Sequence, residues 1–357
     1  MGTGRRCSGA IGSGGSVKIT YRNGLSNALT DSMEEAENVL CLGVGVTEPT
    51  GIFGTTQDAY RRFPQRVIEC PLSENMLTGA CVGLALEGYK PVLVHARMDF
   101  LMLTMEHLVN TAAKWGFMNG RYPNITVRAI VGRGWGQGPT HSQNPAALFA
   151  HIPGLRVYMP YRPSDAYFAL RHAIATEGPV IVVEPRRLYN DEGTMPDPHD
   201  NYYWGLGNIW HPAGVHPDVT IVATSDTLQD AHDSIRALRA GGISAMVVDP
   251  QMFPLPGNLI EDAVTSTGRL VVVDNGWATA GLSSEIIARV CERVDLEVRP
   301  VRVTPPFMPT PASHPLEDTW YPSVDAIVRA CAQVLGRDDL VTPVEPSIPA
   351  PAFKGPF

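Results

Sequence analysis

Residues 66–95, RVIECPLSENMLTGACVGLALEGYKPVLVH, have the pattern of a β-α-β unit. A short strand at 66–70 and an apolar strand at 91–95 flank a helix at 75–88 that is rich in glycine and alanine. Parallel strands need a crossover connection of this kind, which is usually a helix packed on the sheet. The segment therefore predicts a parallel sheet covered by helices.

The same alternation continues on both sides of this unit. Several strands are rich in β-branched residues and apolar on both faces, which is typical of a parallel sheet with helices on each side. The further strands are expected at 39–46, 125–131, 155–159 and 180–184, and the further helices at 25–37, 100–117, 144–150 and 163–176.

A polar segment at 190–205 interrupts the pattern and is the best candidate for a linker. Beyond it we expect strands at 219–224, 243–248 and 269–273, with helices at 228–240, 258–266, 281–290 and 324–335. The sequence thus predicts two doubly wound α/β domains, at 16–195 and 206–337. A Gly/Ser-rich tail at 1–15 and a Pro-rich tail at 338–357 are expected to be disordered or extended.

Composition excludes several classes of protein. The 357-residue chain is 44% hydrophobic and carries a formal net charge of −8, which has the wrong sign for following a phosphate backbone. No uncharged apolar run reaches the roughly 18 residues that a membrane span needs. The six cysteines include no CxxC pair, which favours free thiols in a reducing cytoplasm. We expect a cytoplasmic globular protein that binds neither nucleic acid nor membranes.

The first candidate for chemistry is Glu74. Ser73 is a plausible N-cap, which places Glu74 in the first helical turn, where the free amides and the helix dipole stabilise negative charge. An ordinary capping acid has the same local pattern. The residues alone leave both interpretations open.

The second candidate is His141, which follows a glycine-rich loop at 132–140. A histidine among small polar residues at the carboxyl ends of strands is typical of a catalytic site, although such a loop can also bind phosphate. The loop matches neither GxGxxG nor GxxxxGK[ST], and no GxSxG or metal-ligand spacing occurs. Dinucleotide-binding, P-loop, hydrolase and metalloenzyme functions are therefore without support.

Taken in order, several motifs resemble the beta subunit of the thiamine-diphosphate-dependent decarboxylating component of 2-oxo acid dehydrogenases, a transketolase-like family. The resemblance runs from about residue 17 to 335. The motifs are PLSE (71–74), LVNTAAK (108–114), THSQ (140–143), PGLRV (153–157), PVIVVEP (179–185) and DNGW (274–277).

The resemblance implies a pyrimidine-binding domain followed by a transketolase C-terminal-like domain. It implies that Glu74 contacts the N1′ nitrogen of the aminopyrimidine, that Phe100 stacks on this ring, and that His141 lies near the reacting carbon. It also places Gly45 in the cofactor region. Glu74 and His141 are thus the expected catalytic residues of a 2-oxo acid decarboxylation.

The motif that binds the diphosphate is missing. Thiamine enzymes hold this group through Mg²⁺ with a GDG motif, and the chain contains no Gly-Asp-Gly. The resemblance implies that an alpha-type subunit supplies the motif and the Mg²⁺ in an α2β2 heterotetramer, and that the chain alone is inactive. A lipoyl acyltransferase is a further partner of the family.

Departures from the family leave the substrate and the reaction open. The chain reads Gly43-Val44-Gly45 where the family usually has two carboxylates, and its loop at 133–141 is shorter. His95, Arg97 and Arg133 are candidate substrate residues, since Arg97 or Arg133 could pair with an anionic group. One alternative is a split transketolase-like carboligase that transfers its unit to an aldehyde. A non-catalytic scaffold for an alpha-like partner is the other.

Overall fold

The structure is a computed structural model that describes residues 17–133, 136–195, 204–337 and 339. The predicted tail at 1–15 lies outside the described residues, as does the Pro-rich tail except for Asp339. The five cysteines in the described ranges are free thiols, as predicted. None of the helices in these ranges has the length and apolarity to cross a bilayer.

A seven-stranded sheet forms the first half of the molecule, with the order β12-β6-β7-β5-β4-β2-β3. Every pairing in it is parallel except that of β12, which confirms the predicted parallel sheet. The strands are β2 (Val39–Gly43), β3 (Val67–Glu69), β4 (Lys90–His95), β5 (Thr126–Val131), β6 (Arg156–Tyr158), β7 (Val180–Pro185) and β12 (Met252–Phe253).

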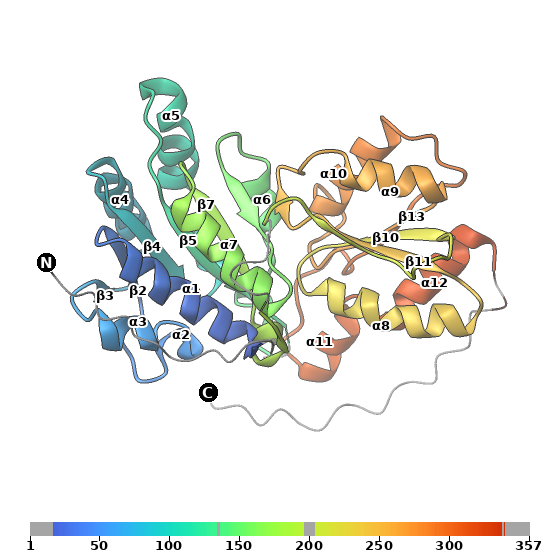
Figure 1. The fold of residues 1–357 in the computed structure, drawn as a ribbon, viewed down its shortest axis with the longest axis horizontal. Helices are drawn as coiled ribbons and strands as arrows, with labels where there is room; N and C mark the ends of the chain where they lie inside the picture. Colours follow the sequence, from blue (N-terminus) through green and yellow to red (C-terminus); the bar gives the residue numbers. More distant parts are fainter. Residues whose placement is uncertain (1–16, 134–135, 196–203, 338, 340–357) are drawn as a thin grey trace, which may run out of the picture.

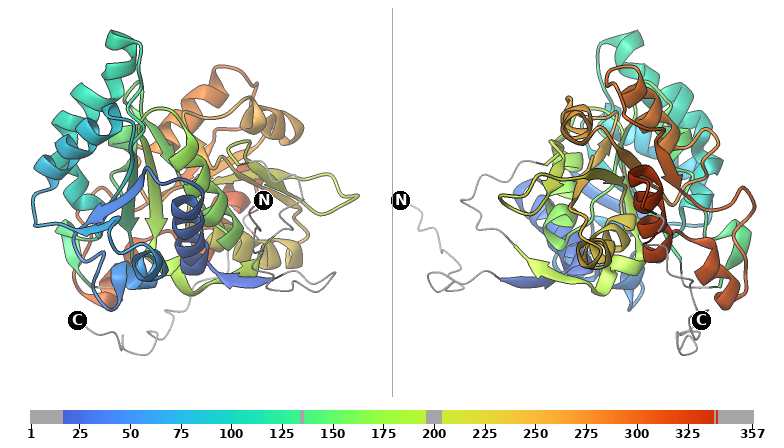
Figure 2. Two further views of the ribbon diagram at one scale, coloured as in Figure 1. Left: turned by 60° about the vertical axis from the view of Figure 1, so that its left-hand side comes forward. Right: turned by 90° about the vertical axis from the view of Figure 1, so that its right-hand side faces the viewer.

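Helices cover both faces of this sheet (Figures 1 and 2). Two apolar clusters, one on each side, fill the space between the sheet and its helices. One face carries α1 (Tyr21–Glu35), α3 (Gln57–Arg62) and α7 (Pro163–Ala175), and the other carries α4 (Glu74–Leu86), α5 (Ala113–Asn119) and α6 (Ala146–Ala150). The short turns are α2 (Gly51–Gly54), η3 (Gly138–Thr140) and η4 (Arg186–Asn190).

The helix predicted at 100–117 is not one regular α-helix. It begins as a 3₁₀ helix, η1 (Met98–Thr104), continues as a π-helix, η2 (Glu106–Ala112), and ends as α5. The Thr104 hydroxyl donates to the Leu101 carbonyl at 2.7 Å, which supports the tighter turn. The prediction of a continuous α-helix was therefore wrong, because an apolar pattern does not distinguish these helical pitches.

A five-stranded sheet of order β14-β13-β10-β11-β9 forms the second half. Its pairings are parallel except that of β9, so the molecule is a two-domain α/β protein, as predicted. The strands are β9 (Asn208–Trp210), β10 (Val219–Ala223), β11 (Ala245–Asp249), β13 (Leu270–Val273) and β14 (Val301–Val303). The helices are α8 (Thr227–Ala240), α9 (Leu259–Thr267), α10 (Leu282–Cys291), α11 (His314–Trp320) and α12 (Val324–Leu335).

Part of the predicted linker segment at 190–205 forms a strand. Its part β8 (Glu192–Thr194) pairs antiparallel with β1 (Lys18–Thr20), which joins this segment to the start of the described chain. Residues 196–203 lie outside the described residues. The chain also returns to the first sheet through β12, which pairs with β6. The two halves are therefore connected at more than one point.

Candidate active site

The candidate residues lie at the edge of the first sheet where its parallel strands end. Phe100 follows β4, His141 follows β5, and Glu74 follows β3. In open parallel sheets, ligands bind outside the carboxyl ends of the strands. The fold thus brings residues from three separate loops to one edge.

Phe100 and His141 are in direct contact. Their ring centroids lie 5.3 Å apart with the planes perpendicular, and both residues are half-buried. The Thr140 hydroxyl lies 2.9 Å from Nδ1 of His141 and orients the imidazole. The structure therefore places the aromatic ring and the histidine on one wall.

Hydrogen bonds between Gln143 and Asp99 link the segments that carry Phe100 and His141. Gln143 donates from Nε2 to the Asp99 carboxylate at 2.7 Å and from its backbone amide to the same oxygen at 3.4 Å. Asp99 is buried and directly precedes Phe100, while Gln143 closely follows His141. Sequence reasoning missed this link, although Gln143 lies in the THSQ motif and Asp99 directly precedes Phe100.

Glu74 is the first residue of α4 and is partly buried. The helix α4 packs against η1, which contains Phe100. Ser73 occupies the N-cap position, but its side chain makes no capping hydrogen bond, and its carbonyl accepts from the Leu77 amide at 2.9 Å. Ser73 is therefore the N-cap residue and Glu74 lies in the first turn, as predicted, but the cap has no side-chain hydrogen bond.

Gly45 forms part of a turn that binds the Glu69 carboxylate. Its φ of +76° is in the region that favours glycine, and its amide donates to the Glu69 carboxylate at 2.5 Å. The same carboxylate accepts from the amide and hydroxyl of Thr47, each at 3.0 Å. Burial alone would raise the pKa of Glu69, but these hydrogen bonds outweigh it and lower the pKa. Glu69 thus brings a carboxylate to the Gly43-Val44-Gly45 turn.

His95 ends β4 and is only 5% exposed. Burial lowers the pKa of His95 to about 4, so the imidazole is neutral at neutral pH. Its Nε2 has no hydrogen-bond partner within the described ranges. A neutral, buried imidazole does not attract an anionic substrate by charge, which argues against the predicted role of His95.

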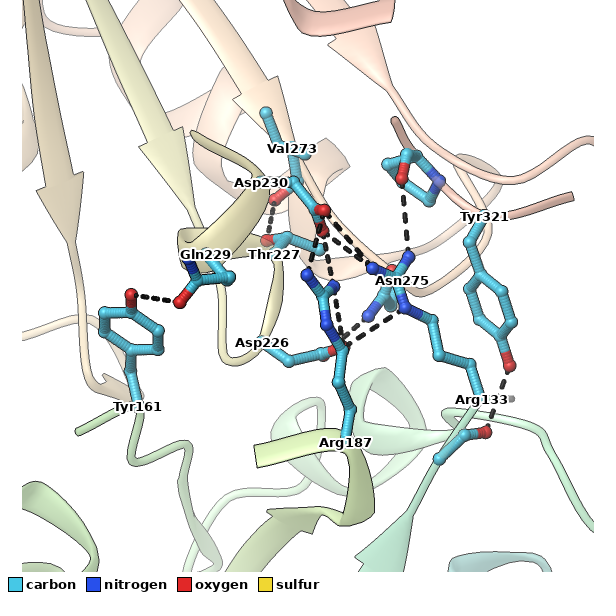
Figure 3. A network of polar contacts seen from close by, with 12 residues as sticks. Arg133, Tyr161, Arg187, Asp226, Thr227, Gln229, Asp230, Val273, Asn275 and Tyr321 are labelled. Carbon is cyan, nitrogen blue, oxygen red and sulfur yellow. Dashed lines mark hydrogen bonds and ion pairs between the residues drawn. The ribbon is translucent and has the colours of Figure 1, made fainter. Parts of the chain in front are cut away.

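Arg133 lies in a polar network between the two halves (Figure 3). Its guanidinium donates to both carboxylate oxygens of Asp230, at 3.2 and 3.0 Å. Arg187 donates to the same carboxylate at 2.7 and 3.0 Å. Arg133 thus has a carboxylate partner in the second half, which it shares with Arg187, and its role in substrate binding stays a prediction.

The second half also holds the loop that precedes His141. The Tyr321 hydroxyl lies 3.0 Å from the Gly132 carbonyl and 3.3 Å from the Ser142 carbonyl, so it bridges the two ends of the loop. Between these ends, the Gly136 amide donates to the buried Glu317 carboxylate at 2.8 Å. The position of His141 thus depends on residues of the second half that the sequence analysis did not identify.

The network between the halves predicts a pH dependence. Burial raises the pKa of Asp230 to about 7, from an ordinary value of 3.8, and the adjacent charge of Arg187 only partly offsets this. The folded protein therefore holds this proton more tightly than the unfolded chain. The corresponding stability is fully present below about pH 3.8 and is lost as the pH rises to about 7. We expect the free energy of unfolding of the wild type, relative to Asp230→Asn, to fall across this range.

Urea unfolding of both proteins at several pH values measures this difference. Between pH 4 and 7, the difference in free energy of unfolding between the two proteins should change by a few kcal/mol at most, since one pKa unit corresponds to about 1.4 kcal/mol. Asp233→Asn, at an exposed position on the same helix, is the control. A difference between wild type and Asp230→Asn that stays constant from pH 4 to 7 would contradict the prediction.

Comparisons with known proteins agree with this architecture. Residues 17–192 match the pyrimidine binding domain of transketolase, and residues 213–327 match the transketolase C-terminal domain.

Within the described residues, no group of three or more histidine, cysteine, aspartate or glutamate side chains converges to hold a metal ion.

Curated relatives cover nearly the whole chain. The beta subunit of acetoin:2,6-dichlorophenolindophenol oxidoreductase from Cupriavidus necator is 31% identical over 333 residues, covering 89% of this chain and 98% of the relative. The beta subunit of the pyruvate dehydrogenase E1 component from Rickettsia bellii is 33% identical over 325 residues, covering 89% and 99%.

A solved structure supports the fold. A split gene transketolase, described as an inactive beta4 tetramer, has a TM-score of 0.72 and 22% identity, covering 89% of this chain and 98% of its own. The two matched domains and the full-length relatives agree with the resemblance that the motifs indicated. The chain therefore belongs to the transketolase-like family of beta subunits of thiamine-diphosphate-dependent 2-oxo acid dehydrogenases.

Proposed function

We propose that this beta subunit supplies one wall of a shared active site that decarboxylates a 2-oxo acid of the pyruvate or branched-chain type. The observation that carries the proposal is the perpendicular contact of Phe100 and His141 at 5.3 Å, at the sheet edge where α4 also begins with Glu74. Three loops supply an aromatic ring, an imidazole and a carboxyl group. This combination suits binding and proton transfer at a cofactor, whereas packing alone does not need it.

The side chains present fit thiamine diphosphate. A half-buried aromatic ring suits the aminopyrimidine, and a carboxyl group suits its ring nitrogen. The Ser142 hydroxyl, next to His141, is buried and has no hydrogen-bond partner within the described residues, so this edge still offers a polar atom to a ligand. When bound, the cofactor supplies a carbon nucleophile and an electron sink for the loss of CO₂.

Each residue then has a defined task. Glu74, the first residue of α4, would hold and exchange a proton at the N1′ nitrogen of the pyrimidine. Phe100 orients the ring by stacking. His141, held by Thr140, is placed to give or accept a proton near the substrate.

Activity requires a partner in this proposal. An alpha-type subunit carries the GDG motif and binds Mg²⁺ and the diphosphate, in an α2β2 heterotetramer that works in the cytoplasm. A lipoyl acyltransferase then receives the acyl group. The absence of Gly-Asp-Gly from the sequence supports this division of labour.

A carboligase is the second candidate. A relative at 31% identity is named for acetoin, which is not a 2-oxo acid, so the family has accommodated more than one donor. The scaffold alternative is weaker, because a scaffold has no use for Glu74, Phe100 and His141 together.

The test is reconstitution with a co-purifying alpha-type chain. The complex, with thiamine diphosphate and Mg²⁺, is given pyruvate, branched 2-oxo acids or acetoin, together with a lipoylated domain or an aldehyde. Mass spectrometry of the product assigns the reaction. We expect CO₂ release and an acylated lipoyl group, whereas a new carbon–carbon bond to the aldehyde would favour the carboligase. Full turnover by the beta chain alone would contradict the proposal of a shared site.

A further inference from the structure

The loop that leads to His141 is held from both halves of the molecule. From the first half, the Arg97 guanidinium donates to the Gln137 side-chain oxygen at 2.9 and 2.6 Å, and the substrate role of Arg97 stays a prediction. From the second half, α11 and the residues on either side of it contact the same loop. The second half therefore reaches the proposed catalytic wall, although Glu74, Phe100 and His141 all belong to the first.

Two glycines of the loop lie directly against Ala312, which precedes α11. A Cβ atom at Gly136 would lie 2.9 Å from the Ala312 carbonyl oxygen, and one at Gly138 would lie 3.1 Å from the Ala312 Cβ atom. Next to this contact, the Gly136 amide donates to the Glu317 carboxylate at 2.8 Å. Side chains at the two glycines would crowd Ala312, so their absence lets the loop approach the second half this closely.

Tyr321 connects the two ends of the loop. It is 7% exposed, and its hydroxyl lies 3.0 Å from the Gly132 carbonyl and 3.3 Å from the Ser142 carbonyl. A hydroxyl has one hydrogen, so the two carbonyls share it in a three-centre hydrogen bond. Burial raises the pKa of the Tyr321 hydroxyl, and the Glu317 carboxylate adds to this, so the hydroxyl keeps its proton and donates. Gly132 follows β5 and Ser142 follows His141, so one hydroxyl joins the strand end to the histidine.

The ring of Tyr321 is itself held on two sides. The Trp320 ring lies perpendicular to it, with the centroids 4.8 Å apart. The Cζ atom of Arg133 lies 5.2 Å from the centroid of the Tyr321 ring, within the range of a cation–π contact. Arg133 is fixed in turn by its two hydrogen bonds to Asp230. The hydroxyl of Tyr321 is therefore presented to the loop by surroundings that are packed and hydrogen-bonded.

We propose that Tyr321 is a positioning residue for His141, so that the second half sets the placement of a catalytic group that the first half carries. This inference rests on the proposed function, because it concerns a histidine that transfers a proton near the substrate. Tyr321 acts through the backbone, by way of the Ser142 carbonyl one residue beyond His141. Misplacement of a catalytic group by about 1 Å can lower a rate about 10²-fold, so loss of this hydrogen bond should appear in kcat.

Tyr161 offers a matched control. Its hydroxyl donates to the Gln229 side-chain oxygen at 3.0 Å, so it too connects the first half to the second through one tyrosine hydroxyl. Figure 3 shows Tyr161 and Tyr321 on opposite sides of the polar network. Tyr161→Phe and Tyr321→Phe each remove one hydroxyl between the halves and keep the ring, but only Tyr321→Phe removes a contact with the loop of His141.

Steady-state turnover by the reconstituted complex is the first test. Tyr321→Phe should lower kcat about 10- to 100-fold and leave KM within about twofold, whereas Tyr161→Phe should leave both unchanged. Tyr321→Phe is then combined with His141→Ala, which removes the imidazole. In that background we expect no further loss of kcat, since no imidazole is left to position. An equal fold loss in both backgrounds would overturn the inference, because Tyr321 would then act on the structure in general and not through His141.

Amide hydrogen exchange of the same complex is the second test and does not depend on turnover. The peptide 136–143 contains three hydrogen-bonded amides, those of Gly136, His141 and Gln143. We expect these amides to exchange faster in Tyr321→Phe than in the wild type or in Tyr161→Phe, because the loop opens more often. Unchanged exchange in Tyr321→Phe would overturn the inference, since the hydroxyl would then not hold the loop.

Together the two tests separate this inference from the proposed function. If the complex turns over a 2-oxo acid but Tyr321→Phe changes neither kcat nor exchange, the inference fails and the proposed function stands. If no 2-oxo acid reacts but exchange in the peptide is faster only in Tyr321→Phe, Tyr321 positions His141 and the proposed function fails.

Discussion

Glu74→Gln is expected to lower kcat/KM of the reconstituted complex by about 10²- to 10⁴-fold, the range for a lost proton-transfer group. Glutamine has nearly the same size and can still accept a hydrogen bond, but it cannot exchange a proton with the N1′ nitrogen. The measurement is steady-state turnover of the preferred 2-oxo acid at saturating thiamine diphosphate.

A control variant separates this effect from damage to the helix. Glu87 is exposed at the C-terminal end of the same helix, so Glu87→Gln removes an equal charge far from the site and should leave turnover unchanged. Size-exclusion chromatography of the Glu74→Gln complex should show an intact assembly, and calorimetry should show that the cofactor still binds. Wild-type turnover in Glu74→Gln would remove the catalytic assignment of Glu74.

Much of the fold could be predicted because its strands are buried on both faces. β5 and β7 are buried at every position, lie between helices and are mostly apolar, so their sequences differ clearly from those of the helices around them. By contrast, β1 and β8 have three residues each and depend on pairing with each other across the chain. No local pattern in the polar segment at 190–205 indicates such a partner.

In the candidate site, too, local motifs could be recognised from the sequence, but contacts between distant segments could not. Glu74 and His141 could be proposed from the sequence because their motifs are continuous in it. The contact of Arg133 with Asp230 could not be predicted, because Asp230 is distant in the chain and comes from α8. Tyr321 was missed for the same reason, since its contacts with Gly132 and Ser142 exist only once the two halves have packed together.

A charged pair inside the first sheet should have a large effect on the stability of the protein. Arg128 of β5 and Glu184 of β7 are both completely buried, with Nε and Oε1 2.5 Å apart and Nη2 and Oε2 2.9 Å apart. The Tyr189 hydroxyl donates to Glu184 at 2.8 Å, and Arg128 donates to the Thr55 hydroxyl at 2.8 Å. The pair therefore connects the sheet to η4 and to Thr55 at the end of α2.

Removing one member of this pair should be far more harmful than removing both. Glu184→Leu leaves a buried guanidinium without its counter-charge, so we expect a loss of about 3–5 kcal/mol in the free energy of unfolding, measured with urea. The double variant Arg128→Met/Glu184→Leu replaces the charges with apolar side chains and should recover most of this loss. Arg61→Met, at an exposed ion pair, should change stability by less than about 1 kcal/mol. If the double variant is as unstable as the sum of the two single variants, the cost comes from lost packing and hydrogen bonds around Tyr189 and Thr55, not from an uncompensated charge.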